Sequence, residues 1–381
     1  MTKPMPSPGA SAKPFTVAHA QADHWGLAAK ACLEGVAAAA PEADLGLLYA
    51  TEAFGGDLPS ILTFLRETTR IQRWVGGVAP GVVAGTSEYR DCGGLAVMVG
   101  RLPDGAASCF SGLDVAAVRA RLGVGEGPHV ALVHGDARNP GLAALIDAAA
   151  GSDGFLVGGL MSAAGPPAQV AETVVSGGLS GLLLSPGVEL VAGLTQGCTP
   201  LGGEHVVTDA WEGVVMGLDG LAALDVLKAE AGDLIARDPR RAAGYIHVGL
   251  PVAGSDTGDY LVRNLVGIDP RQGWLAVADR VAVGQRLMFV RRDPNAAQRD
   301  MARMLEGVAR RLDGRPVRAA VYVTCVARGR HMFGRDGAEM EMIRDALGDI
   351  PVIGFCANGE ISRDRLYGYT GVLAVLPGDR P

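Results

Sequence analysis

Three stretches of this chain repeat one pattern: an apolar strand, a helix, a second strand with a glycine turn, and a third apolar strand. In that order of elements, the copies occupy residues 43–50, 57–69, 74–77 and 93–98; residues 130–133, 140–150, 155–159 and 177–184; and residues 319–324, 338–347, 352–355 and 368–375. Such repetition indicates one supersecondary unit used three times. A glycine after an α/β strand also allows backbone to approach a ligand closely. The repeat therefore predicts both the fold and where a site should be sought.

Four more apolar runs, at residues 244–250, 260–267, 274–278 and 286–290, are typical of strands. Together with the repeats they predict an α+β (mixed α/β) protein. We expect repeated strand–helix–strand–strand units, mixed sheets with helices packed on one face, and two pseudo-related halves. The pattern leaves open whether the halves share one continuous sheet or pack two sheets face to face.

The domain limits follow from two polar segments. Residues 1–14 are rich in Pro, Ser and Ala and lack an apolar signal-peptide core, so we expect a flexible lead. Residues 237–242 are polar and contain Pro239, which is typical of a domain boundary. The sequence thus predicts a first domain over residues 15–240 and a second over residues 241–381.

Composition narrows the classes of partner. The net charge of −7 comes without a basic block, which argues against nucleic acid. No run of about 18 apolar residues occurs, so no membrane partner is expected. Six scattered cysteines without a CxxC pair favour a reduced, cytoplasmic protein. The 55 glycines, where average usage gives about 27, fit many short strands joined by tight turns.

A set of short segments, in chain order, resembles the FIST family, with its N-terminal and C-terminal regions. The segments are Phe155-Leu156-Val157-Gly158-Gly159, Gly177-Gly178-Leu179, Thr195-Gln196-Gly197-Cys198-Thr199-Pro200-Leu201-Gly202, Asp219-Gly220, residues 260–267, Cys325-Val326-Ala327-Arg328-Gly329, Gly354-Phe355, Gly359-Glu360-Ile361 and Tyr369-Thr370. The resemblance covers about residues 43–376. It implies a sensory module for small ligands, proposed to include amino acids, of the kind fused to bacterial signalling outputs. Because the chain has no room for a kinase, cyclase or F-box output, we expect a stand-alone sensor with a signalling partner protein.

The third copy supplies the first group of candidate ligand residues. Cys325 ends its first strand, and strand ends are where open α/β sheets bind ligands. Arg328 could hold a carboxylate by a two-point hydrogen bond and lower the Cys325 pKa. Glu360 could take an amino group beside the glycine turns of Gly354 and Gly359. The alternative is a buried thiol next to a solvated basic loop, with Glu360 in a structural salt bridge to Arg263.

The other candidates lie elsewhere in the chain. Gly158 and Gly159 form the equivalent turn of the second copy, and Cys198 lies in a polar turn between two strands. Arg263 could bind a carboxylate and Asn264 could add a hydrogen bond. For Cys198 the alternative is a small buried residue that packs a turn.

A second strand end in the repeats also carries polar residues. His134 and Asp136, at the end of the first strand of the second copy, could bind a ligand or act as an acid–base pair. The alternative, which we favour, is that Asp136 shapes the turn and His134 satisfies backbone groups.

These patterns favour a ligand-binding sensor over two rivals. We expect a cleft between the halves, lined by the glycine turns with Arg263, Cys325, Arg328 and Glu360, and a shift of the halves upon binding. One rival is a protein-interaction module without a small ligand. The other is an enzyme with Cys325 as nucleophile and His134 or His331 as base. Since no complete catalytic constellation, cofactor motif or metal-ligand spacing occurs, we expect no enzyme activity, no cofactor and no metal.

Overall fold

The computed structural model describes residues 14–123, 127–162, 164–165, 169–232, 244–252 and 259–380. Residues 1–13 of the expected lead (residues 1–14) and the expected domain boundary, residues 237–242, lie outside these ranges. The chain divides into two compact units. Unit 1 comprises Met1–Thr195, Met301–Leu366 and Gly371–Pro381, and unit 2 comprises Gln196–Asp300 and Tyr367–Thr370. Each unit therefore contains residues from both sides of residue 240, where the sequence predicted the first domain to end.

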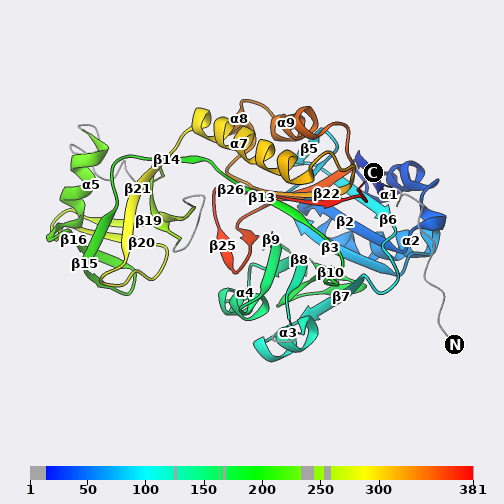
Figure 1. Ribbon diagram of the computed structural model, residues 1–381, viewed down its shortest axis with the longest axis horizontal. Coiled ribbons are helices and arrows are strands. Elements are labelled where there is room, and N and C mark those ends of the chain that lie inside the picture. The colour runs from blue at the N-terminus through cyan, green and yellow to red at the C-terminus, as the bar shows by residue number, and fades with distance from the viewer. Residues whose placement is uncertain are drawn as a thin grey trace. The chain divides into compact units, whose positions relative to one another are not determined.

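Unit 1 contains the first two repeats and most of the third, and each copy is longer than the sequence predicted (Figure 1). The first consists of β1 (Thr16–Gln21), α1 (Trp25–Val36), β2 (Leu45–Thr51), α2 (Leu58–Thr69), β3 (Arg73–Ala79), β4 (Gly81–Ala84), β5 (Ser87–Arg90) and β6 (Gly94–Gly100). The second consists of β7 (Ala107–Gly112), α3 (Val115–Leu122), β8 (His129–Asp136), α4 (Leu142–Ala150), β9 (Gly154–Met161), β10 (Gln169–Ala171), β11 (Thr173–Val175) and β12 (Leu179–Leu184). The third consists of β13 (Val191–Gln196), α7 (Pro294–Leu312), β22 (Val317–Cys325), α8 (Arg330–Phe333), α9 (Ala338–Leu347), β23 (Val352–Ala357), β24 (Glu360–Ser362), β25 (Arg365–Tyr367) and β26 (Thr370–Pro377).

The same strand pairing recurs in every copy. The first core strand pairs in parallel with the strand that follows its helix, as in β2–β3, β8–β9 and β22–β23. It pairs antiparallel with the last strand, as in β2–β6, β8–β12 and β22–β26. An edge strand then lies beside the last strand, giving the neighbours β1–β6, β7–β12 and β13–β26. The predicted repeat, mixed sheets and mixed α/β class are confirmed.

Each copy also donates its β-hairpin to the sheet of another copy. The β4–β5 hairpin of the first copy pairs with β23 of the third. The β10–β11 hairpin of the second copy pairs with β3 of the first, and β24 of the third copy pairs with β9 of the second. The exchange is cyclic, so the three sheets of unit 1 are joined by backbone hydrogen bonds and not by side-chain packing alone.

The glycine of each repeat lies where a neighbouring strand leaves no room for a side chain. An added Cβ would meet a carbonyl oxygen of the neighbouring parallel strand at 1.9 Å for Gly76, 1.8 Å for Gly158 and 1.7 Å for Gly354. Real side chains never tolerate such distances, so these three positions require glycine for strand packing. The repeated glycine signal therefore has a structural cause that does not involve a ligand.

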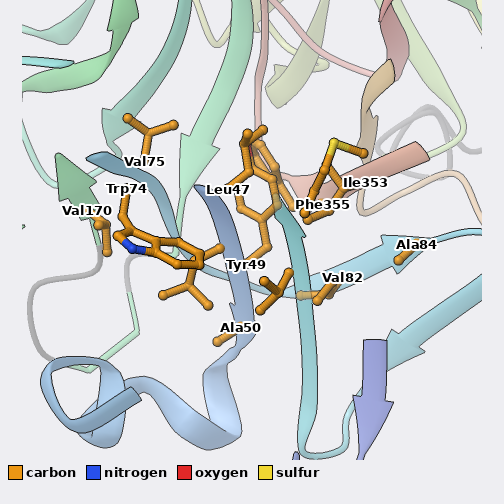
Figure 2. Packing of buried hydrophobic residues seen from close by; sticks show 14 of the residues in the cluster. Leu47, Tyr49, Ala50, Trp74, Val75, Val82, Ala84, Val170, Ile353 and Phe355 are labelled. Atoms are coloured by element: carbon orange, nitrogen blue, oxygen red, sulfur yellow. The ribbon is translucent and has the colours of Figure 1, made fainter. Parts of the chain in front are cut away.

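Aromatic rings from the three sheets meet inside unit 1. Tyr49 of β2 lies 5.5 Å from the ring of His134 of β8 and 4.8 Å from the ring of Phe355 of β23, and all three are fully buried. Figure 2 shows Tyr49 and Phe355 next to each other in the apolar core. The faces of the sheets that turn away from this junction are covered by helices, as Ala131 and Val133 of β8 are by Leu142 and Leu145 of α4. Since both faces are buried, the strands read as continuous apolar runs.

Unit 2 interrupts the third repeat between β13 and most of α7. It contains β14 (Cys198–Pro200), β15 (His205–Trp211), β16 (Val214–Leu218), β17 (Leu221–Ala222), α5 (Ala223–Ala231), β18 (Ile246–Pro251), β19 (Tyr260–Asp269), β20 (Trp274–Val277) and β21 (Arg286–Arg292). Antiparallel pairs run in the order β21, β15, β16, β20, β19 and β18, and β18 pairs back to β21. The strands therefore close into a barrel around apolar side chains such as Phe289 and Val248. The described strands form three sheets and a barrel, and two of these sheets and the barrel combine strands from both sides of residue 240, so the halves share several sheets and not one.

Candidate functional site

Arg328 lies in a buried ion pair. Its side chain is 1% exposed, and its Nε donates to Glu339 Oε1 at 2.8 Å. The same carboxylate accepts from the hydroxyl of Tyr322 at 2.6 Å and from Thr324 at 3.0 Å. Burial alone would lower the pKa of the guanidinium, but the Glu339 charge raises the pKa of Arg328 above its ordinary value. Arg328 is therefore paired with a carboxylate of its own chain, Glu339 of α9, where the sequence predicted the carboxylate of a ligand.

The remaining third-repeat candidates lie along two strand ends. Cys325 is the last residue of β22 and is buried. Gly354 lies against the backbone of Tyr322, whose carbonyl oxygen would be 1.7 Å from an added Cβ. Glu360 is fully buried at the start of β24, where it pairs with Gly159 of β9. An added Cβ at Gly159 would lie 3.0 Å from the carbonyl oxygen of Gly359, so these glycines hold the exchanged hairpin close. The structure brings Gly158, Gly159, Gly359 and Glu360 together in one strand pairing.

Three of the predicted residues belong to unit 2. Arg263 of β19 donates from Nε to Asp279 at 2.6 Å, so its ion-pair partner is Asp279. Asn264 accepts a hydrogen bond from the Tyr369 hydroxyl at 2.7 Å. Cys198 is buried in an apolar cluster with Tyr260 and Val290, and its carbonyl accepts from the Tyr260 hydroxyl at 2.8 Å. Cys325, Arg328, Gly354, Gly359, Glu360, Gly158 and Gly159 belong to unit 1.

A pocket of about 470 Å³ lies in the second repeat, and none of the candidate residues predicted from the sequence lines it. We call it the second-repeat pocket, and it is lined by Ser111, Gly112, Leu113, Asp114, Ala117, Arg121, Gln169, Val175, Ser176, Gly178, Leu179 and Ser180. Small-molecule sites have volumes of roughly 300–1,000 Å³. The pocket therefore has the size and the polar side chains of a site for a small polar molecule.

One wall of the second-repeat pocket is a face of α3. Asp114, Ala117 and Arg121 lie at positions i, i+3 and i+7 and so share that face. Asp114 caps the helix, since its Oδ1 accepts from the Ala117 backbone at 2.8 Å. The wall thus carries an aspartate and an arginine whose backbone positions lie about two helical turns apart.

Ser180, a lining residue of the pocket, and its cross-strand neighbour His134 each have a buried polar atom without a hydrogen-bond partner in the described chain. Ser180 lines the pocket, is 1% exposed, and its hydroxyl makes no hydrogen bond with any described residue. His134 lies directly across from Ser180 in the β8–β12 pair, so the two side chains share one face of the sheet. His134 Nε2 lies 2.8 Å from the Tyr49 hydroxyl, while Nδ1 is buried and lacks a hydrogen bond to the described chain. Burial lowers the pKa of His134 to about 3, so the ring is neutral.

Gln169 and Asp136 fix the backbone around this group. The Gln169 side-chain amide donates to the carbonyl oxygens of His134 at 2.5 Å and Gly178 at 3.2 Å. Asp136 accepts from the Gly177 backbone at 2.7 Å and from Arg138, whose hydrogen bonds lower the pKa of Asp136 to about 2. The prediction that Asp136 shapes the turn is confirmed. The prediction that His134 satisfies backbone groups is wrong for its side chain, because its Nε2 pairs with the Tyr49 hydroxyl.

Sequence reasoning missed Ser180 and Gln169 as candidates for the site. Ser180 is a single polar residue in the apolar strand 179–184, and this interruption was the available signal. Its importance depends on the cross-strand register with His134, which no local pattern gives. Among the described residues, no group of three metal-ligating side chains occurs, and none of the described helices is both long and apolar enough to cross a bilayer.

Comparison of the sequence with known proteins identifies relatives and a family. An uncharacterized protein of Mycobacterium tuberculosis (strain CDC 1551 / Oshkosh), MT0656, is 34% identical over 211 residues, which cover 53% of this chain and 55% of that protein. A Mycobacterium bovis protein, the uncharacterized Mb0898c, is 34% identical over 215 residues, covering 54% of this chain and 55% of its own length. The chain thus spans about half the length of these relatives. The FIST N domain matches residues 44–221 and the FIST C domain matches residues 223–363, domains associated with signal transduction, and the chain belongs to the FIST family.

Proposed function

We propose that this chain is a cytoplasmic sensory protein that binds a small polar ligand in the second-repeat pocket and passes the signal to a partner protein. The observation that carries the proposal is the pocket itself, with its volume of about 470 Å³ and its lining of serines, Asp114, Arg121 and Gln169. Amino acids and other small carboxylates are the class to test first, because Asp114 and Arg121 offer partners for an amino group and a carboxylate.

A ligand screen with two tryptophan variants tests the location of the site. Ala117 lines the pocket on α3, whereas Ala116 on the same helix is exposed and does not line it. Ala117→Trp fills the pocket, and Ala116→Trp adds the same side chain outside it. We expect an amino acid or small carboxylate to raise the melting temperature of the wild type and of Ala116→Trp, but not of Ala117→Trp. At a ligand concentration of about 100 times Kd the stabilisation is about 2.7 kcal/mol.

The outcome of this screen also decides between the pocket and the residues first predicted from the sequence. A ligand whose affinity survives in Ala117→Trp but is lost in a folded Arg328→Ala variant would move the site to the third repeat. A screen without any hit would refute the small-ligand function.

One observation favours a partner protein as the output. Unit 2 exposes several large apolar side chains, with exposed fractions of 67% for Trp211, 77% for Tyr245 and 64% for Val266. Exposed aromatic residues are enriched where proteins bind one another. A protein-interaction module without a small ligand is therefore the second candidate function, and it predicts partner binding that no metabolite alters.

A further inference from the structure

We propose that unit 1 holds a second binding site, which takes a small apolar molecule into a cavity where its three sheets meet. The cavity has a volume of about 70 Å³, and every described residue that lines it is apolar. It shares none of these residues with the second-repeat pocket, so the inference goes beyond the proposed function and does not depend on it. Water finds no hydrogen-bond partners in such a space, whereas cavities with aliphatic and aromatic walls stay dry and bind apolar molecules.

The three repeats supply equivalent side chains to the wall of this cavity. The glycine of each repeat faces the same point of the first core strand, which is occupied by Leu48, Val133 and Tyr322. One residue earlier, these strands carry Leu47, Leu132 and Val321, and all three line the cavity. Since successive side chains of a strand point to opposite faces, this position faces the junction in every copy.

The cavity exists because the third repeat has the smallest side chains at these positions. Across from them, the last strand of each copy carries Met98, Leu182 and Ala374, which also line the cavity. Ala374 thus lies where the other copies have a long side chain, and Val321 lies where they have leucine. Because backbone hydrogen bonds hold the neighbouring strands in place, the missing volume is not closed by collapse and remains as a cavity.

The ends and the size of the cavity limit what it can hold. The next inward position of β2 is Tyr49, whose ring packs against His134 and Phe355, so the junction is filled on that side. On the opposite side the lining residues Leu190 and Leu376 are only partly buried, and we expect a ligand to enter there. An apolar cavity of about 150 Å³ binds benzene or xenon, so a space of about half that volume fits a few non-hydrogen atoms. These can be a free molecule or the terminal alkyl group of a longer one.

Binding is favourable because the side chains around the cavity gain contacts. In the free protein they lack van der Waals partners on the side that faces the space. An apolar ligand supplies these contacts and at the same time leaves water. A charged or hydrogen-bonding group would lose its hydration without a partner in return. The cavity therefore selects apolar groups.

The test uses the full chain with carbon-13 label in the methyl groups of leucine and valine. Xenon serves as the free apolar molecule, and hexanol carries a terminal alkyl group. We expect xenon to shift the methyl signals of Leu47, Leu132 and Val321 saturably. The signals of Leu113 and Val175, which line the second-repeat pocket, should stay unchanged. The same shifts with hexanol would extend the site to alkyl chains, and shifts with xenon alone would limit it to free molecules.

Two substitutions at equivalent positions of the repeat complete the design. Ala374→Leu gives the third copy the side chain that Leu182 supplies in the second, and we expect the affinity for xenon to fall at least about tenfold. Met98→Leu exchanges side chains of similar volume in the first copy, and the affinity should change less than about threefold.

A smaller substitution guards against misfolding of the leucine variant. Ala374→Val adds less volume, and it replaces Ala374→Leu if the latter loses its cooperative melting transition. An absence of saturable shifts with both probes would overturn the inference, as would equal affinity of xenon for the wild type and for a folded variant at Ala374.

Discussion

Single residues in unit 1 are constrained most where two backbones leave no room for a side chain. Gly158 has φ of 155° and faces the carbonyl oxygen of Val133 across the β8–β9 pair. The equivalent positions Gly76 and Gly354 face Leu48 and Tyr322 in the same way. This shared constraint explains why glycine recurs in the three repeats without reference to a ligand.

Replacement of Gly158 by alanine should therefore destabilise the protein strongly. The new Cβ would lie 1.8 Å from the Val133 oxygen, so the parallel pair must separate. We expect Gly158→Ala to lower the free energy of unfolding by about 3 kcal/mol or more. Gly56→Ala is the control, because nothing lies within 4 Å of its added Cβ. Urea unfolding of both variants measures the difference, and similar losses in the two would contradict the explanation.

The Arg328–Glu339 pair gives a second prediction about single residues. Glu339→Gln would leave the guanidinium of Arg328 buried without a negative partner, so we expect a loss of about 3–5 kcal/mol in unfolding free energy. Glu341→Gln on the same helix breaks a solvent-screened pair with Arg335 and should lower the unfolding free energy much less than Glu339→Gln does. Calorimetry of both variants provides the comparison. A small effect of Glu339→Gln would mean that water or another group reaches Arg328.

At the scale of elements, His205 joins β15 to two other segments of unit 2. Its Nδ1 lies 2.7 Å from Asp219, after β16, and its Nε2 lies 2.8 Å from Glu230 on α5. Burial by itself lowers the pKa of His205, but the hydrogen bonds and charges of the two carboxylates outweigh burial and raise the pKa above its ordinary value. Only the protonated ring can donate to both carboxylates.

This linkage makes the contribution of His205 depend on pH. Because its folded pKa is raised, the stabilisation is complete below the unfolded pKa of about 6.5 and is lost as pH rises through the folded value. At each pH the unfolding free energy of His205→Asn is compared with that of the wild type. We expect the loss to be larger near pH 5.5 than near pH 9. An NMR titration should place the His205 pKa above about 6.5. A titration midpoint below that value, or a cost that grows with pH, would refute the linkage.

The sequence predicted elements better than it predicted their partners. The strands expected at residues 244–250, 260–267, 274–278 and 286–290 correspond to β18, β19, β20 and β21, because their apolar runs are local signals. The closure of these strands into a barrel, and the hairpin exchange between repeats, depend on pairings between segments far apart in the chain. The pairing of His134 with Ser180 and with Tyr49 has the same origin, and so these contacts could not be found from the sequence.

For unit 1 as a whole, the meeting of three sheets creates an interior that side chains fill unevenly. On one part of the junction the rings of Tyr49, His134 and Phe355 fill the space. Elsewhere an apolar cavity of about 70 Å³ remains, and all three sheets contribute to its lining. The lining consists of Phe15, Leu45, Leu47, Met98, Leu102, Leu132, Val157, Leu182, Leu184, Leu190, Ala319, Ala320, Val321, Ala374 and Leu376. A cavity with such walls offers water no hydrogen bonds, so the space costs packing energy.

A larger side chain at this junction should therefore stabilise the protein. Ala374 of β26 lines the cavity, and Ala374→Val adds two methyl groups of a residue that favours strands. We expect a gain of about 1 kcal/mol in unfolding free energy, since each buried methylene contributes about 0.8 kcal/mol and part is lost to imperfect fit.

Ala131→Val is the matched control, because Ala131 is fully buried against the helix layer and does not line the cavity. Overpacking there should cost about 1–3 kcal/mol. Denaturant midpoints that move in opposite directions would support the cavity, whereas a loss in both variants would show that the three sheets already fill their junction.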